Sequence, residues 1–469
     1  MVWRMNKGDI TMHHKNGKLW LLMTILAGLN QPLFADSSDV IELLSVLKQN
    51  GVISEEQYQS LYDSQVTKIQ QEQKMAVEEA KSKKKDNAPI VSFKDGGPKI
   101  ESADKAYSAE LHGRLQVDSA WYADDQRALG DGAEVRRAYL SVNGKIAKDF
   151  DYKLEYDFAN SVVQDMYLRY NHYAPFMLTA GYFKEPFSLE ELTSDLNITF
   201  MERGLPNVFA PSRKIGLMGS AYNNWGSFSL GGFGADANDN DHPETAGGEE
   251  GDEGWRVATR GTFSPIHEEG KVVHMGAAVD YWSPADRTAR IRQRPESHVT
   301  DVRLVDTGSL GYIDDMTTFG AELAGVWGPL SLQGEYMQND ISRKEGGSPT
   351  FSGWYAYASY FLTGESRPYD YKTGTFGRVK PKRNFPNGPG AWELAARYSS
   401  LDLQDADVQG GKEDDITLGL NWYLNPQVKV KAEYVMIDAE PSTAYSGNDT
   451  QKGKDDSPEV YQMRVQYDF

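Results

Sequence analysis

Apolar and polar residues alternate strictly, in short segments, from residue 107 to the end of the chain. In 150–158, one set of alternate positions holds Phe, Tyr, Leu, Tyr and Phe, and the other holds Asp, Lys, Glu and Asp. Because successive side chains of a β-strand point to opposite faces, this pattern predicts strands with one apolar and one polar face. A single strand of this kind fits a soluble β-sandwich as well as a membrane barrel.

Repetition and length distinguish these two folds. A tilted strand that crosses a membrane needs about 9–11 residues, and segments near that length recur sixteen times. We therefore predict an all-β fold, a sixteen-stranded antiparallel transmembrane β-barrel, whose even strand number leaves both ends on one side. The predicted strands are 107–121, 134–143, 150–158, 164–173, 176–183, 213–222, 227–235, 254–263, 272–282, 317–327, 330–339, 351–362, 391–400, 415–423, 428–437 and 459–469.

The connections between these strands alternate between short and long. Tight turns such as 223–226 and 328–329 alternate with polar stretches such as 283–315. Short periplasmic turns and long outer loops are the arrangement of outer-membrane barrels. The segment 363–389 is the exception, because it is long where a short turn is expected.

The composition fits a barrel and excludes other classes. Mean hydropathy is −0.58 although 12% of the residues are aromatic, which argues against a polytopic helical membrane protein. A barrel combines these values because every second residue faces water. The absence of Cys excludes a disulfide scaffold and a Cys-based metal or redox site, and the net charge of −19 argues against a nucleic-acid partner.

Residues 1–35 are predicted to be a secretory signal peptide. Lys15 and Lys18 precede an apolar run at 19–29, and 33–35 fits a cleavage site. The alternative is a membrane anchor, for which the run is short because a spanning helix needs about 20 apolar residues.

Residues 36–85 are predicted to be a periplasmic helical segment, because their apolar residues follow helical spacing. Ser54 and Gln57 match a capping box at the start of its second helix. A weak heptad leaves two interpretations open, a coiled-coil oligomerisation stalk and a solvated linker helix. Residues 86–105 are predicted to be a linker and 106–469 the barrel.

If the apolar face of each strand meets lipid, the opposite face lines a water-filled lumen of mixed charge. Many basic lumen positions are Arg, whose planar fork suits phosphate or carboxylate oxygens, so local rings of charge would set selectivity. We call the odd or even position of a residue along its strand its parity, because this position decides which face the side chain is on. The basic side chains that parity assigns to the lumen are Arg114, Arg137, Lys153, Arg169, Arg256, Arg260, Arg397, Lys429 and Lys431.

Two segments outside the strands are candidate functional sites. Arg290, Arg292 and Arg294 lie on one face of an extended stretch, which fits an anion funnel in an outer loop and equally a solvated loop. The stretch of about 184–212 is too apolar for a free surface loop. A loop folded into the barrel to narrow it would explain this composition.

The last strand ends on Phe469, with Tyr467 two residues earlier. A terminal aromatic residue in this pattern is typical of proteins delivered to the outer-membrane assembly machinery. We therefore expect that machinery and outer-membrane lipid as partners, and the outer membrane of a Gram-negative bacterium as the location.

Over about 105–469 the chain resembles the phosphate-selective porin O and P family. The resemblance rests on short motifs that occur in one order. They are HGRLQ at 112–116, VRRAYL at 135–140, KDFDYK at 148–153, FSLE at 187–190, MER at 201–203, RIRQR at 290–294, LTGE at 362–365, GAWEL at 390–394 and NWY at 421–423.

The resemblance implies a homotrimeric porin with an inward third loop, a passive channel for small anions that include phosphate or polyphosphate. It also implies a β-bulge that brings both Arg136 and Arg137 to the site, because parity alone places only one inside. The residues that match the family's arginine ladder are Arg114, Arg136, Arg137, Arg203, Arg290, Arg292 and Arg294. Asp165 matches its acidic constriction residue. The residues at its constriction loop are Lys184, Glu191, Thr193 and Ser194. Lys184 and Glu191 depart from the phosphate-specific pattern, so we expect the constriction to differ from that of the phosphate-specific members.

Three other functions remain open. Acidic lumen residues fit a general, weakly selective porin. An enzyme built on the barrel would need a triad, and the eight His show no recurring triad or ligand spacing, so we predict no catalytic residue, metal or cofactor. Residues 36–85 would also suit a structural tether.

Overall fold

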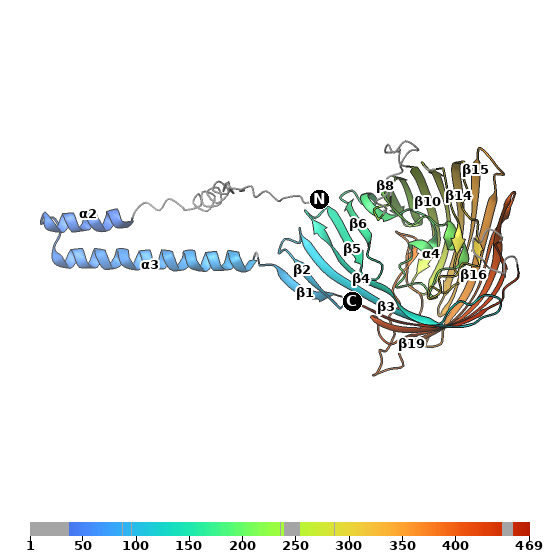
Figure 1. Ribbon diagram of the computed structural model, residues 1–469. Helices are drawn as coiled ribbons and strands as arrows, with labels where there is room; N and C mark the ends of the chain where they lie inside the picture. The colour runs from blue at the N-terminus through green and yellow to red at the C-terminus, as the bar shows by residue number, and fades with distance from the viewer. Residues whose placement is uncertain are drawn as a thin grey trace, which may run out of the picture. The chain divides into compact units, whose positions relative to one another are not determined.

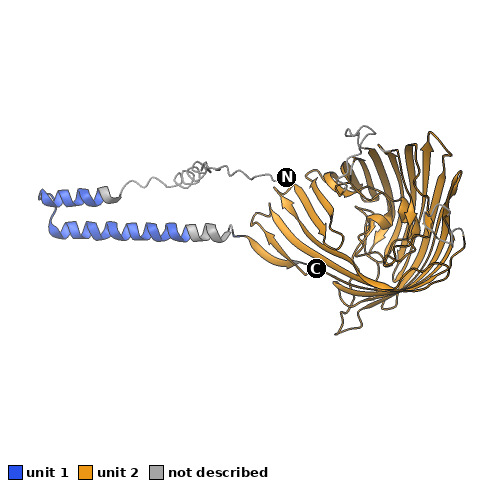
Figure 2. Ribbon diagram, viewed as in Figure 1, with its two compact units in different colours: residues 1–88 blue, residues 89–469 orange. Residues whose placement is uncertain are grey.

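The computed structural model describes residues 37–86, 88–94, 96–234, 236–238, 254–285, 287–442 and 454–469. The predicted signal peptide at 1–35 therefore lies outside the described residues. The chain divides into two compact units, residues 1–88 and 89–469 (Figure 2). In the described part, no helix is both long enough and apolar enough to cross a membrane.

Two helices make up the described part of the first unit, α2 (Ser37–Gln49) and α3 (Glu55–Asp86). The predicted capping box stands at the start of α3. The Ser54 backbone N–H donates to Gln57 Oε1 at 3.0 Å, and the Gln57 N–H donates to Ser54 Oγ at 3.3 Å. Glu55 and Glu56 then favour the positive end of the helix dipole.

The second unit is a closed antiparallel barrel (Figure 1). Within the described ranges sixteen strands form the ring, and the last strand pairs with the first across Val465 and Val117. This confirms the predicted fold. The strands are β3 (Ser108–Ala123), β4 (Gly132–Ile146), β5 (Phe150–Asp157), β6 (Val162–Tyr170), β7 (Phe176–Lys184), β8 (Arg213–Asn223), β9 (Gly226–Phe233), β10 (Trp255–Glu268), β11 (Lys271–Ser283), β14 (Ile313–Trp327), β15 (Leu330–Arg343), β16 (Thr350–Phe361), β19 (Ala391–Asp405), β20 (Val408–Tyr423), β21 (Val428–Pro441) and β22 (Glu459–Asp468).

The barrel has polar side chains inside and apolar side chains outside. In β22, Tyr461, Met463 and Val465 are exposed on the outer wall, while the residues between them are buried in the lumen. Exposed Trp225 lies in the short turn between β8 and β9, and exposed Trp327 ends β14 beside another short turn. This is the distribution expected of a barrel with lipid around it and an aromatic girdle at the membrane interface.

The strands extend further toward the long loops than predicted. β20 begins at Val408 rather than 415, because its paired register with β19 continues to Asp405. Charged residues such as Lys412 and Asp414 interrupt the apolar alternation there, so the pattern that marks a lipid-facing strand ends before the hydrogen-bonded ladder does.

The prediction of a linker at 86–105 needs correction, because this segment contains strands β1 (Ile90–Lys94) and β2 (Gly97–Glu101). They form a hairpin, and β2 pairs with the start of β3 through Lys99 and Glu110. This hairpin extends the sheet where the ring closes.

The terminal residue takes part in that closure. The Phe469 N–H donates to Gly113 O at 3.0 Å, and the Gly113 N–H donates back to Phe469 O at 3.1 Å. The aromatic ring covers Gly113 so closely that an added Cβ would lie 2.5 Å from ring atom Cε1. Phe469 therefore completes the seam and requires a glycine beside it.

Replacing Gly113 with leucine should destabilise the folded barrel by about 1–3 kcal/mol, because overpacking displaces neighbouring groups. The measurement is the temperature at which the folded band converts to the unfolded band in heat-modifiability electrophoresis. Gly219→Leu on β8 is the matched control, since no atom lies within 4 Å of its added Cβ. Equal melting of the two variants would contradict the proposed role of the seam.

Two further segments lie within the ring. Residues 185–212, between β7 and β8, contain α4 (Leu189–Leu192) and the 3₁₀ helix η1 (Leu205–Phe209), and Figure 1 shows α4 surrounded by strands. Residues 362–390 enter from the opposite, short-turn side and contain β17 (Tyr369–Asp370) and β18 (Thr375–Phe376). In the outer loop at 284–312, β12 (Arg292–Gln293) pairs with β13 (Val305–Asp306).

Candidate functional site: a charged constriction

The segment 185–212, the constriction loop, folds inward because it carries apolar side chains. Phe187 and Leu205 are fully buried against lumen residues such as Met337 and Phe351. The backbone polar groups of the loop also need partners away from bulk water. Wall residue Glu335 accepts the N–H groups of Leu189 at 2.9 Å and Glu190 at 2.7 Å, so the start of α4 is fixed to β15.

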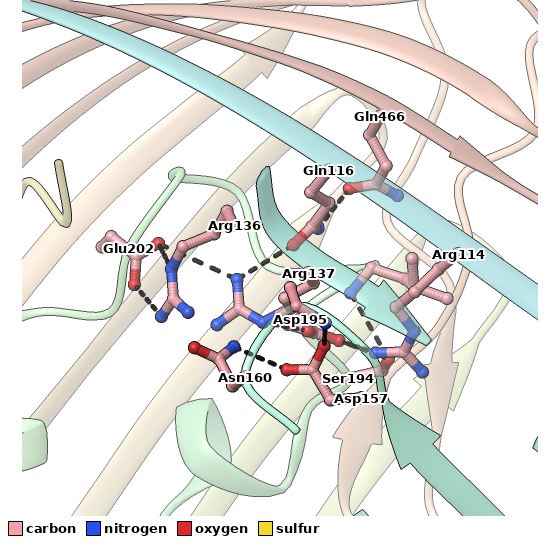
Figure 3. Close-up of polar contacts among 12 residues, drawn as sticks. Arg114, Gln116, Arg136, Arg137, Asp157, Asn160, Ser194, Asp195, Glu202 and Gln466 are labelled. Atoms are coloured by element: carbon pink, nitrogen blue, oxygen red, sulfur yellow. Dashed lines mark hydrogen bonds and ion pairs between the residues drawn. The ribbon is translucent and has the colours of Figure 1, made fainter. Parts of the chain in front are cut away.

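One carboxylate of the loop lies between two arginines of the wall (Figure 3). Arg137 Nε lies 2.6 Å from Asp195 Oδ2, and Arg114 contacts the other oxygen of Asp195. Arg137 also donates to Gln116 Oε1 at 2.9 Å, and Arg114 stacks over Tyr139 at 4.5 Å. Both guanidinium groups are therefore oriented before any ligand arrives.

A second loop carboxylate holds Arg136. The β3–β4 register passes from the Gln116–Arg137 pair to the Val117–Val135 pair, so Arg136 is the extra residue of a β-bulge. Arg136 donates to both oxygens of Glu202, at 2.9 and 3.1 Å. The bulge thus places two consecutive arginines in the lumen, each facing a loop carboxylate.

A third group of charges connects the two ends of the loop. Lys184 Nζ lies 2.8 Å from Glu191 Oε1, and Arg203 Nε lies 3.2 Å from Glu191 Oε2. Arg203 also donates to the carbonyl of Glu190 at 3.0 Å. Glu191 is therefore buried as the counter-ion of two cations, and it does not face the pore as an isolated negative charge.

These residues separate two cavities. The inner cavity, of about 570 Å³, is lined by nine basic and five acidic side chains. The outer cavity, of about 310 Å³, is lined by five arginines, His298, Glu202 and Glu296. Arg203 lines both cavities, so the constriction loop stands between them.

Most of the predicted site residues line these cavities, and two do not. Arg290 points away to Asp306, with Nε 2.8 Å from Oδ1, and Thr193 is buried and accepts the N–H of Phe376 at 3.3 Å. Burial would raise the pKa of Asp306, but hydrogen bonds from Arg290 and from the Gly308 N–H lower it below its ordinary value. The residues at the inner cavity are Arg114, Arg137, Asp165, Lys184, Glu191, Ser194 and Arg203, and those at the outer cavity are Arg136, Arg203, Arg292 and Arg294.

Parity assigned several basic residues to the lumen, but the structure divides them. Lys153, Arg169 and Arg260 line the inner cavity. Arg397, Lys429 and Lys431 are buried beneath the constriction loop and line neither cavity. Parity gives the direction of a side chain but does not show what covers it.

Several functional residues were missed from the sequence. Arg213 and Lys372 line the inner cavity and Arg303 the outer one, while Asp195 and Glu202 hold the arginines. Arg213 could have been found from its place at the start of a strand beside the loop. The other residues lie in loops, where alternation carries no information.

The segment 362–390 forms part of the inner cavity wall. Arg260 donates to the carbonyls of Thr373 at 3.0 Å and Gly374 at 2.8 Å, and Tyr369 OH lies 2.6 Å from His274 Nδ1. These contacts place Lys372 at the cavity, over the ring of Tyr222 at 5.2 Å.

Among the described residues, two cations of the inner cavity have no acidic partner. Arg169 and Lys372 have no carboxylate within ion-pair distance among the described residues, while the other basic residues mostly do. Arg169 lies over Tyr167 at 5.1 Å. Within the described ranges, no set of three or more His, Asp or Glu side chains is arranged to hold a metal ion.

Comparison with known proteins gives two sequence relatives. A model of the family described as phosphate-selective porin O and P matches residues 110–469. Porin O of Pseudomonas aeruginosa is 28% identical over 428 residues, which cover 82% of this chain and 93% of that protein. An uncharacterized protein of Caulobacter vibrioides is 31% identical over 401 residues, which cover 82% of this chain and 78% of that protein. Among solved structures, the outer membrane channel DcaP of Acinetobacter baumannii has a TM-score of 0.48 at 11% identity, over 78% of this chain and 98% of that one.

Proposed function

The chain belongs to the phosphate-selective porin O and P family, and we propose that this outer-membrane porin is a passive channel that favours anions, phosphate or polyphosphate among them. The observation that carries the proposal is local charge. Nine basic and five acidic side chains surround the inner cavity, although the whole chain has a net charge of −19. The nearest fixed charges govern which ion enters a narrow pore.

The pairing of the arginines suggests how an anion is passed on. An anion first meets Arg292, Arg294 and Arg303 in the outer cavity. It then competes with Glu202 for Arg136 and with Asp195 for Arg137, since guanidinium binds phosphate and carboxylate oxygens with the same geometry. A carboxylate that returns to its arginine assists the release of the anion, so binding stays weak enough for conduction.

The test is electrical. Reversal potentials are measured in planar bilayers across a KCl gradient, and the measurement is repeated with phosphate added as a blocker. We expect an anion-selective potential and a chloride current that falls as phosphate is added. A cation-selective channel would refute the proposal.

One observation favours a second candidate, a general porin with weak selectivity. Asp195, Glu202, Glu191 and Asp165 neutralise most of the cations near the constriction. If these ion pairs persist during conduction, the excess positive charge is small. A chloride current that phosphate does not reduce, together with a reversal potential near zero, would favour this candidate.

We also propose a homotrimer, with residues 36–85 acting as a periplasmic stalk and Phe469 as the assembly determinant. The trimer proposal is based on the family resemblance.

The outer-loop arginines should matter mainly at low salt. Replacing Arg292 and Arg294 together with alanine should reduce chloride conductance at 0.01 M KCl, where the screening length is about 30 Å, and have little effect at 1 M, where it is about 3 Å. Single-channel conductance against salt concentration measures this. Arg287→Ala is the control, because Arg287 pairs with Asp314 on the surface and lines neither cavity. An equal loss at both salt concentrations would contradict the funnel.

A further inference from the structure

Four basic side chains of the barrel wall are buried beneath the constriction loop. They come from β19, β21 and β22, and none of them lines the inner or the outer cavity. They are Arg397, Lys429, Lys431 and Arg464. A permeant anion in either cavity would not touch them.

These cations bind the backbone of the loop at five carbonyl groups. A chain segment without regular secondary structure leaves its carbonyl oxygens unpaired unless other groups supply donors. Here the four cations supply donors to five of the seven carbonyls from Leu196 to Glu202. Lys429 donates to Leu196 O, Lys431 to Ile198 O and Phe200 O at 2.8 Å each, Arg464 to Met201 O, and Arg397 to Glu202 O at 3.0 Å.

Lys431 depends on the loop for all of its recorded hydrogen-bond acceptors. Its side chain is fully buried, and no carboxylate among the described residues lies within ion-pair distance of its ammonium group. A buried charge is costly unless polar partners surround it. Both acceptors of Lys431 are loop carbonyls, so the loop in its docked position is what solvates this charge.

The carbonyl contacts also determine where the loop carboxylates lie. Arg397 binds the backbone of Glu202 while Arg464 binds its side chain, with Nη2 2.6 Å from Oε1. Leu196 follows Asp195 directly, and Lys429 holds it. Any displacement of the loop would therefore move Asp195 and Glu202 away from Arg137 and Arg136.

We propose that Lys431, together with Lys429, Arg397 and Arg464, is a positioning residue that sets the depth of the constriction loop and hence the width and charge of the narrow zone. These residues act on selectivity through the loop backbone and make no contact with the permeant. The inference uses the proposed function only because it needs a conducting pore for its test. If the wild-type protein does not conduct, the proposed function is refuted. If the wild-type protein conducts and the Lys431 variant has the same conductance and thiol reactivity, only this inference is refuted.

The test combines conductance with a reporter on the loop. The chain has no Cys, so Ser194→Cys introduces a single thiol at the inner cavity. The rate of current change after addition of the negatively charged reagent methanethiosulfonate ethylsulfonate reports the exposure of that thiol. Lys431→Met is compared in this background with Lys412→Met, which removes a surface lysine paired with Asp402 on the neighbouring strand.

We expect Lys431→Met to react about tenfold faster, because loss of a hydrogen bond from a charged donor shifts a docking equilibrium by roughly that factor. Its conductance at 1 M KCl should also rise. Loss of a positive charge near the pore would by itself lower the chloride conductance, so a rise in conductance reports a wider pore. Lys412→Met should match the Ser194→Cys parent in both measurements.

Unchanged conductance and reactivity in a folded Lys431→Met barrel would overturn the proposal, as would equal changes in the Lys412→Met control. If Lys431→Met does not assemble, Lys429→Met provides the second test. Of the contacts to the loop backbone, it removes the one to Leu196, and it should show the same changes at smaller amplitude. An assembled Lys429→Met channel identical to its parent would then overturn the proposal.

Discussion

Replacing Arg137 with alanine is expected to lower the anion-to-cation permeability ratio about tenfold. Arg137 is 6% exposed and lies at the inner cavity, where it pairs with Asp195. A unit charge acting over 4 Å contributes between about 1 kcal/mol in water and about 4 kcal/mol at an effective dielectric constant of 20. Since 1.4 kcal/mol corresponds to a factor of ten, the predicted loss lies toward the lower end of that range.

The loss of anion preference should persist at high salt, because the constriction between the two cavities holds few mobile ions to screen the charge of Arg137. Reversal potentials at 0.1 M and 1 M KCl measure it. Arg137→Lys is the matched control, which keeps the charge but loses the planar fork. It should therefore retain anion preference and show weaker block by phosphate. An Arg137→Ala channel with the wild-type reversal potential would exclude Arg137 as a selectivity determinant.

Replacing Glu202 with glutamine should strengthen the block of chloride current by phosphate about tenfold. Glu202 accepts hydrogen bonds from Nε and Nη2 of Arg136, so phosphate has to displace it from this edge of the guanidinium group. A hydrogen bond between charged groups contributes about 1.5–3 kcal/mol, and the neutral amide competes less well for the same donors. The measurement is the phosphate concentration that halves the single-channel current.

The loop should stay docked in this variant. Arg464 retains its two contacts to Asp118, at 2.7 and 2.6 Å, and Arg397 binds the Glu202 carbonyl rather than its side chain. Asp402→Asn is the control, since it removes one negative charge on the outer wall, where Asp402 pairs with Lys412. Unchanged or weaker phosphate block in Glu202→Gln would show that Glu202 is not a competitor of the permeant.

The departure of this chain from its family at the constriction has a structural explanation. By the family resemblance, Glu191 and Lys184 are the two residues that depart from the phosphate-specific pattern. The two residues form an ion pair at 2.8 Å, with Arg203 on the other side of Glu191. The second change therefore compensates the first, and the net charge of this group remains positive.

The alternation by itself determined the fold. Period two fixes which side chains face lipid, and ten-residue segments repeated sixteen times leave little choice except a closed transmembrane ring. The resemblance added the bulge at Arg136, which parity could not supply. The limits of β20 were predicted too short, because the ladder continues beyond the lipid-facing pattern.

The tertiary structure decided which charges reach the pore. Parity is a local property, since it follows from the direction of a side chain on its own strand. Whether that side chain meets water, a carboxylate or a carbonyl depends on the path of segments far away in sequence. Asp195 reaches Arg114 across 81 positions, and Lys431 reaches Phe200 across 231. Arg137 and Lys431 have the same alternation signature, and only the folded path of residues 185–212 places one at the cavity and buries the other beneath the loop.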